Sequence, residues 1–303
     1  MDRMQHHSRG MAAILAASLL WGTTGTAATF APDISPLAIG AFAMGVAGLL
    51  LMMGSLGELI RDRIQLLSLR RSLLLGGLAV AIYPLAFYSS MRLSGVAVGT
   101  VVSIASAPLF TVMLEWLLNR RPVSLRWGLS FAFGSLGIGS LALGRSAVSV
   151  GDVSDLVAWL GVCVGLLAGL TYAVYSWVAR HMIEQGVGSG SAMASLFGVA
   201  AILLLPSLLW TGQNLFASPV NAGVVLYMAL VPMFIGYLCF GYGLRYIAAS
   251  TATLITLLEP VVAVVLAVLV VGEWLAPVGW VGIPLIMVSL VLQTLRRPDK
   301  RAG

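Results

Sequence analysis

The chain has 303 residues, of which 59% are hydrophobic and only 9% are charged, and its mean hydropathy is +1.00. Soluble domains carry about 25% charged residues, so this balance excludes an ordinary soluble protein and indicates an integral membrane protein. The formal net charge is +6, but the basic residues lie between apolar runs and at the chain ends, so no nucleic-acid partner is expected.

The apolar runs predict ten transmembrane helices. A spanning helix needs about 20 mostly apolar residues, and Pro, Gly and charges mark the breaks between runs. The expected helices cover residues 11–30, 36–55, 73–92, 95–117, 126–144, 156–178, 190–210, 221–244, 248–271 and 277–295. Several linkers are so short that neighbouring helices must run antiparallel. The expected fold class is therefore an all-α polytopic membrane protein.

The basic residues also predict the orientation. If the N-terminus is cytoplasmic, only Arg92 and Arg145 of the 17 Lys and Arg residues fall on the outer side. Lys and Arg in short loops collect on the cytoplasmic side, so both termini are expected in the cytoplasm. The positive charge then serves topology and contact with anionic lipid heads.

The chain contains an internal repeat. The stretches Leu15–Trp21 and Ala105–Leu109 have similar counterparts 152 residues further along, and Arg92 has a counterpart in Arg245, 153 residues further along. A single one-residue gap reconciles these offsets. A shared offset is typical of a duplicated chain rather than of chance matches.

The repeat predicts two halves, residues 1–146 and 147–303, with five helices each. Because five is odd, the second half must be inverted relative to the first. Inverted repeats with helices interrupted at matching positions are the pattern of secondary transporters, whose binding site lies near the membrane midplane. Pro108 and Pro260 are expected to be those matching interruptions.

Three stretches resemble a known family. They are Ala-Ala-Ser-Leu-Leu-Trp-Gly at 16–22, Leu-Leu-Glu-Pro-Val at 257–261 and Gly-Glu at 272–273. Together with the five-plus-five repeat, they resemble the drug/metabolite transporter superfamily and its EamA-type exporters, most of all the bacterial inner-membrane exporters of aromatic amino acids. The resemblance covers essentially the whole chain. It implies a location in the inner membrane of a bacterial cell and export of small metabolites by alternating access through a central cavity. The chain departs from the family pattern at 119–122, where many relatives carry Gly-Glu and this sequence has Asn-Arg-Arg-Pro.

Glu259 is expected to be the only carboxylate deep within an apolar segment. A carboxylate at bilayer depth is costly unless it is paired or solvated, so it is a candidate functional residue. The following Pro260 removes a backbone donor, and the helix is expected to bend or break there. Two roles stay open for Glu259: proton coupling or pairing with a substrate ammonium, and a structural or gating role in a broken helix.

Aromatic and hydroxyl side chains inside the predicted helices are candidates for the substrate path. Aromatic rings that face a cavity can stack on a planar substrate, and small hydroxyls can bind its polar groups or satisfy freed backbone groups. The expected substrate-binding residues are Trp21, Tyr83, Phe87, Ser103, Tyr172, Tyr237 and Thr256, and the expected gating or coupling residues are Pro108, Glu259 and Pro260.

No cofactor, metal or catalytic site is expected. The sequence has no Gly-Lys-Ser/Thr phosphate loop and no His-Glu-x-x-His site, and Cys163 and Cys239 lie in apolar runs. The expected partners are a small-molecule substrate, membrane lipid and a possible coupling proton. The alternatives are a permease for another amphipathic metabolite or drug-like cation, a non-transporting receptor and an intramembrane enzyme.

Overall fold

The computed structural model describes residues 2–120, 122–145, 155–272 and 274–294. Within these ranges every regular element is helical. The α-helices are α1 (Asp2–Gly22), α2 (Thr24–Ala28), α3 (Pro36–Gly54), α4 (Leu56–Ser68), α5 (Arg70–Ser94), α6 (Val96–Asn119), α7 (Leu125–Arg145), α8 (Asp155–Glu184), α9 (Ser189–Thr211), α10 (Pro219–Met228), α11 (Gly236–Leu244), α12 (Ala249–Ile255), α13 (Leu258–Leu266) and α14 (Pro277–Thr294). Two π-helical segments, η1 (Ala229–Ile235) and η2 (Ala267–Val271), join or extend them.

The predicted helical membrane fold is confirmed. Within the described ranges, nine helical stretches are long and apolar enough to cross a membrane. A further apolar helix, Pro277–Gln293, is shorter than these. The tenth crossing and the inversion of the two halves therefore stay predictions.

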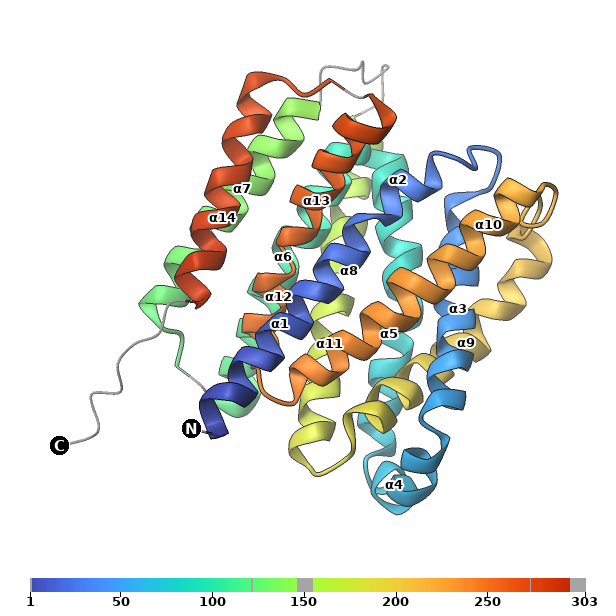
Figure 1. Cartoon of the computed structure of the whole chain (residues 1–303), viewed down its shortest axis with the longest axis vertical. Helices are drawn as coiled ribbons and strands as arrows, with labels where there is room; N and C mark the ends of the chain where they lie inside the picture. Colours follow the sequence, from blue (N-terminus) through green and yellow to red (C-terminus); the bar gives the residue numbers. More distant parts are fainter. Residues whose placement is uncertain (1, 121, 146–154, 273, 295–303) are drawn as a thin grey trace.

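The helices of the two predicted halves interleave. α5 packs along α8, α3 along α9, and α7 along α14, while α1 crosses α11 and α13. In each pair, one helix precedes residue 146 and the other follows it, so the bundle has one shared core (Figure 1). The N-terminus and α4 lie at one end of this bundle, and α2 lies at the other.

The predicted break next to Glu259 is confirmed. α12 ends at Ile255 and α13 begins at Leu258. In a continuous helix the carbonyl of Thr256 would accept from the amide of residue 260, but proline has no N–H. The Thr256 carbonyl instead accepts from the Glu259 amide at 3.0 Å. This tighter turn offsets the chain and separates the two helix axes.

The expected interruption at Pro108 is wrong, because α6 is one continuous helix with Pro108 inside it. α6 lies very close to α8: a Cβ added at Gly169 would stand 2.8 Å from the Ser103 carbonyl oxygen. Close backbone packing of this kind holds a membrane helix in line even where a proline removes one hydrogen bond. Proline alone therefore does not decide where these helices break.

α4 was not predicted from the sequence. This 13-residue helix mixes polar with apolar residues, so it contains no apolar run of spanning length. It connects α3 to α5 and lies across the foot of the bundle, where Figure 1 views it nearly along its axis. α5 accordingly begins at Arg70, three residues before the expected start of the third transmembrane segment.

Candidate functional site

Two adjoining cavities lie among the helices. The outer cavity has a volume of about 360 Å³, and the inner one has about 50 Å³. Trp21, Thr24, Phe87, Tyr88 and Glu259 line both, so the two are parts of one site. Small-molecule sites range from about 300 to 1,000 Å³. The combined space therefore suits one small metabolite.

The outer cavity reaches the end of the bundle opposite the N-terminus. Its walls are α2 and the linker after it, the last turns of α5 and α7, the first turns of α6, and α13. Each wall contributes lining residues: Pro32 from the linker after α2, Met91 from α5, Thr100 from α6, Leu141 from α7 and Ala263 from α13. Since neighbouring helices alternate in direction, these ends of the helices all lie at the same end of the bundle (Figure 1).

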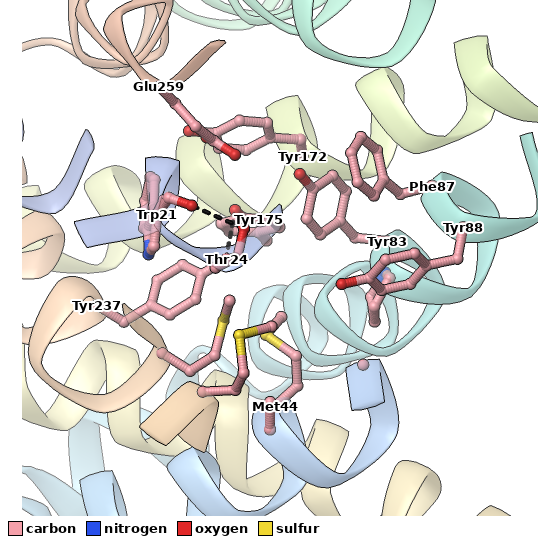
Figure 2. A pocket seen from close by; sticks show the side chains of 15 residues that line it. Trp21, Thr24, Met44, Tyr83, Phe87, Tyr88, Tyr172, Tyr175, Tyr237 and Glu259 are labelled. Atoms are coloured by element: carbon pink, nitrogen blue, oxygen red, sulfur yellow. Dashed lines mark hydrogen bonds between the residues drawn. The ribbon is translucent and has the colours of Figure 1, made fainter. Parts of the chain in front are cut away.

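Aromatic rings surround the inner cavity. We define the aromatic cluster as Trp21, Tyr83, Phe87, Tyr88, Tyr172, Tyr175 and Tyr237, all of which line it. Figure 2 shows these rings arranged around a common space, with Glu259 reaching toward it from one side and Met44 closing it on another. The members come from α1, α5, α8 and α11, so both predicted halves contribute.

Trp21 is held by the distorted stretch around Pro232. Its indole Nε1–H donates to the Pro232 carbonyl oxygen at 2.9 Å. The ring also packs on Gly236, where an added Cβ would lie 2.6 Å from Nε1, and its centroid is 4.8 Å from that of Tyr237. The wide π-helical turn of η1 and the adjacent glycine thus fix the orientation of the indole.

Hydrogen bonds also fix three tyrosines of the aromatic cluster. The Tyr172 hydroxyl donates to Thr256 Oγ1 at 3.0 Å, and that hydroxyl donates in turn to the Thr253 carbonyl at 2.8 Å. The Tyr175 and Tyr237 hydroxyls share a hydrogen bond of 3.2 Å. The break before α13 therefore orients one wall of the aromatic cluster.

Glu259 is the single acidic residue of the cavity lining. Among the described residues that line the two cavities, no other is acidic and none is basic. Among the residues that the structure describes, none forms a hydrogen bond or ion pair with its carboxylate, although its backbone amide is bonded to Thr256. A carboxylate without a partner next to aromatic rings can bind an ammonium group or a proton.

The structure brings most of the expected site residues together. Trp21, Tyr83, Phe87, Tyr172 and Tyr237 all line the inner cavity, and Pro260 joins Glu259 in the outer wall. Thr256 lies behind Tyr172 and orients it.

Two expected residues lie elsewhere. Ser103 is fully buried, and its carbonyl faces Gly169 where α6 meets α8. Pro108 lies further along α6, away from the lining given above. Neither position was distinguishable from a cavity position by helical spacing alone.

Several lining residues were not selected from the sequence. Tyr175 follows Tyr172 by three residues and so shares its helix face, a signal that was available. Tyr88 lies next to Phe87 and reaches the cavity from a different direction. Met44, Met228 and Met233 also line the inner cavity, and nothing in their local sequence separated them from core residues.

A comparison with known protein families identifies the family of this chain. The model of the EamA-like transporter family matches residues 8–143 and 159–295, which is most of the chain. The chain is a member of the EamA-like transporter family. It is therefore a membrane transporter, and the resemblance to the drug/metabolite transporter superfamily is confirmed.

The EamA-like transporter also resembles individual proteins. The "Uncharacterized transporter YwfM" of Bacillus subtilis (strain 168) is 32% identical over 293 residues, 95% of each chain. The "Uncharacterized inner membrane transporter YedA" of Escherichia coli (strain K12) is 29% identical over 67% of this chain and 62% of its own length. The "Probable terminal-alkyne amino-acid exporter" of Streptantibioticus cattleyicolor is 26% identical over 65% of this chain and 64% of its own length.

A solved structure shares the fold. It has a TM-score of 0.76 at 17% sequence identity and covers 95% of this chain and 96% of its own. At this identity the likeness supports the arrangement of helices and carries no statement about cargo.

The N-terminal end of this EamA-like transporter is closed by buried polar contacts. Glu115 of α6 accepts a hydrogen bond from the Ser250 hydroxyl at 2.6 Å and from the Ser250 amide at 3.1 Å. The Trp127 indole donates to the Ser250 carbonyl at 3.2 Å. These three side chains are buried, so α6, α7 and α12 meet without an opening between them.

Glu115 corrects the expectation that Glu259 is the only carboxylate within the apolar segments. Glu115 is only 6% exposed, and its partners satisfy it. It escaped notice because it stands four residues before Asn119, close to the charged end of α6. Within the described membrane-crossing helices, one enclosed carboxylate, Glu115, is thus bonded at the closed end, and another, Glu259, has no described partner at the cavity.

Two further contacts join α8 to its neighbours at the closed end. The Trp177 indole donates to Asn119 Oδ1 at 2.8 Å, which links α8 to the last turn of α6. Arg180 donates to the Leu244 carbonyl, which links α8 to α11. It also donates to Glu184 within α8. We use "closed end" below for the region of Glu115, Ser250, Trp127, Trp177 and Asn119.

Proposed function

We propose that this transporter exports small amphipathic amines with an aromatic or apolar body, with aromatic amino acids as the first candidates. The observation that carries the proposal is the aromatic cluster around one cavity with Glu259 as its single charge. The rings would stack on a planar side chain, and the carboxylate would pair with the ammonium group. The printed name of the Streptantibioticus relative, an amino-acid exporter, agrees with such a cargo.

Transport would proceed by alternating access between two inverted halves, residues 1–146 and 147–303. The two segments that match the family model, 8–143 and 159–295, support this division. The packing supports it as well: α5 and α6 pack on α8, and their expected counterparts α11 and α12–α13 pack on α1. Each half would then present its first helix to the third and fourth helices of the other.

The orientation follows from the basic loops. With ten crossings, both termini would lie in the cytoplasm of a bacterial cell, and the cavity mouth would face away from it. The described state is then outward-facing, with the closed end toward the cytoplasm. Export requires a second state, in which the contacts of Glu115 and Ser250 separate and the cavity mouth closes.

Glu259 would couple the two states. Its carboxylate can hold the cargo ammonium or a proton, and a proton that displaces the cargo on the outer side would favour release there. No cofactor takes part, and the cargo leaves chemically unchanged. The competing interpretations of a receptor or an intramembrane enzyme require no solute flux, so flux distinguishes them from this proposal.

A second candidate cargo is an amphipathic organic cation. The lining contains a carboxylate and no Arg or Lys to receive a substrate carboxylate. An amino acid would have to rely on hydroxyls such as those of Thr24, Tyr83 and Tyr88 for its carboxylate. A cation without an acidic group would need no such donor.

Uptake into liposomes tests the proposal. Purified protein would be reconstituted and offered radiolabelled phenylalanine, tryptophan or leucine, or a labelled aromatic amine, with and without a pH gradient. Saturable uptake of the aromatic amino acids, with each competing against the other, is the expected result. Uptake of the amine alone would select the second candidate. Failure to take up any of the four compounds under both conditions would contradict both cargo assignments.

A further inference from the structure

The helix α4 has two faces with different surroundings. Asp62 and Leu66 are buried toward the bundle, whereas Leu56, Ile60, Ile64 and Leu67 are each more than half exposed. The spacing of these four residues, at i, i+4, i+8 and i+11, places them on one helix face. We call them the apolar stripe of α4. An exposed stripe of four large aliphatic residues requires an apolar neighbour.

The hydrocarbon core of the membrane is not that neighbour for the whole helix. α4 has 13 residues, which at 1.5 Å per residue gives about 20 Å, too short to cross a bilayer. Glu58, Arg61, Asp62 and Arg63 occur within it. It connects two membrane-crossing helices and lies across the end of the bundle (Figure 1). This is the position of the boundary between headgroups and acyl chains.

Basic side chains accompany the stripe. Arg63 is three residues after Ile60 and four before Leu67, so it lies along the same face. Arg70 and Arg71 follow directly at the start of α5, and all three arginines are exposed. Among the described residues, the structure gives none of the three a carboxylate partner. Long basic side chains beside an apolar helix face can extend to lipid phosphates.

Hydrogen bonds on the inner face of α4 hold the helix with its apolar stripe outward. The Asp62 carboxylate accepts a hydrogen bond from the Gly188 amide at 2.8 Å, and Glu58 accepts one from the Ser191 amide at 3.3 Å. Gln65 donates to the Gln185 carbonyl. All three partners belong to the turn before α9 or to its first turn. The acidic residues of α4 therefore point inward, and its basic residues and the apolar stripe face outward.

We propose that α4 is a binding site for anionic phospholipids. The apolar stripe inserts into the acyl boundary of the leaflet at the closed end, and Arg63, Arg70 and Arg71 bind the phosphates of anionic headgroups. The charge complementarity between three unpaired arginines and an anionic surface selects this partner over a neutral one. A second copy of the chain would present the same positive charges and would be repelled.

Spin labels on α4 test the proposal. Exposed Cys163 and half-buried Cys239 would first be replaced by alanine, and single cysteines would then carry a nitroxide at position 60, 61, 64, 67 or 68. In vesicles of phosphatidylcholine with added phosphatidylglycerol, we expect several-fold higher accessibility to oxygen than to a water-soluble nickel complex at 60, 64 and 67. The opposite order is expected at 61 and 68. Equal access of the nickel complex to all five would contradict insertion.

Variants that lack the three arginine charges test the preference for anionic lipids. The label at position 64 is expected to move deeper when phosphatidylglycerol is added. In the variant with Arg63→Gln, Arg70→Gln and Arg71→Gln, this shift should be lost while the label stays in the membrane. Arg92→Gln, an exposed arginine at the other end of the bundle, is the matched control and should keep the shift. A wild-type depth that does not depend on phosphatidylglycerol would overturn lipid selectivity.

The same labels test the competing occupant. Dipolar broadening of the position 64 spectrum at high protein density, lost on dilution with unlabelled protein, would mean that a second copy covers the stripe. That outcome would overturn the proposal. Because these measurements report the position of α4 and not transport, they stand whatever the cavity carries.

Discussion

The two ends of the bundle differ in how they treat a carboxylate. At the closed end, Glu115 is buried and receives hydrogen bonds from the Ser250 hydroxyl and amide. At the cavity, Glu259 lies among aromatic rings, and the described part of the chain offers its carboxylate no donor. A bonded carboxylate stabilises one arrangement of helices. A carboxylate without a partner is available for a ligand.

The same difference applies to the helices that carry these residues. α12 and α13 are two parts of one predicted helix, separated by the turn at Thr256 and Leu257. α12 is bonded to α6 at the closed end, whereas α13 lines the cavity. The turn between them separates the part that is bonded at the closed end from the part that lines the cavity.

Replacement of the cavity carboxylate should have the largest effect on transport. Glu259→Gln keeps the shape of the side chain and removes its charge. A hydrogen bond to a charged group contributes about 1.5–3 kcal/mol, so we expect uptake of an amine-bearing substrate at low concentration to fall about tenfold or more. Thermal unfolding in detergent should change little. Unchanged uptake with unchanged pH dependence would exclude Glu259 from both binding and coupling.

Removal of one ring from the aromatic cluster should have a smaller effect. Tyr83 is half-buried and contacts Phe87 and Tyr172 with centroid distances of 5.8 and 5.4 Å. An aromatic contact contributes about 0.5–1.5 kcal/mol, so Tyr83→Ala should raise the KM for an aromatic substrate by about three- to tenfold. The half-buried Tyr246 at the other end supplies the control Tyr246→Ala, which should leave KM unchanged. Equal effects of the two variants would contradict a role for the cluster in binding.

Removal of the Ser250 hydroxyl at the closed end should lower the thermal stability of the protein and change the equilibrium between its two transport states. Ser250→Ala leaves the Glu115 carboxylate with one donor fewer in a buried site. Such losses cost about 1–3 kcal/mol, and the midpoint of thermal unfolding in detergent should fall by several degrees. The control is Ser140→Ala, because Ser140 bonds only to its own helix. A midpoint equal to that of the control would mean that the Glu115–Ser250 contact does not hold the end closed.

A small pH effect is expected at α4. Burial alone would raise the pKa of the Asp62 carboxyl, but the Ser191 hydroxyl, the Gly188 amide and Arg61 around it hold that pKa below its ordinary value of 3.8. A depressed pKa in the folded state adds stability that is present above the ordinary pKa and lost as the pH falls through the folded value.

The contribution is therefore complete at neutral pH and fades below about pH 4. Asp62→Asn should lower the unfolding midpoint slightly at neutral pH, and the difference from the wild type should shrink as the pH falls toward 3. A difference that stays constant over this range would show that the Asp62 charge is not what matters.

The cavity was largely predictable because it follows helical spacing. Tyr83 and Phe87 lie one turn apart, as do Tyr172 and Tyr175, and aromatic residues within apolar segments are few enough to be weighed individually. The break at Glu259–Pro260 was also predictable, since proline frees a known carbonyl. These features depend on short-range geometry.

The closed end was not predictable in the same way. Glu115 and Ser250 are 135 residues apart, and their contact depends on how α6 packs against α12. Pro108 and Pro260 show the same limit, because identical residues gave a continuous helix in one place and a break in the other. α4 is a different case: its amphipathic spacing is visible in the sequence, but a search for spanning runs passes over it.

The accessibility of Thr100 and of Thr253 distinguishes an open cavity from a closed end. Each stands eight residues after its arginine, Arg92 or Arg245, yet Thr100 lines the outer cavity and Thr253 is 1% exposed at the closed end. Single cysteines at these positions, in a background without Cys163 and Cys239, would be modified with a membrane-impermeant maleimide from each side of the membrane.

At rest, we expect rapid modification at position 100 from the side opposite the N-terminus and protection at position 253. With Ser250→Ala added, protection should decrease at 253, from the N-terminal side, and increase at 100. Equal reactivity of the two cysteines at rest, or a rise at 253 without a fall at 100, would contradict alternating access through this cavity.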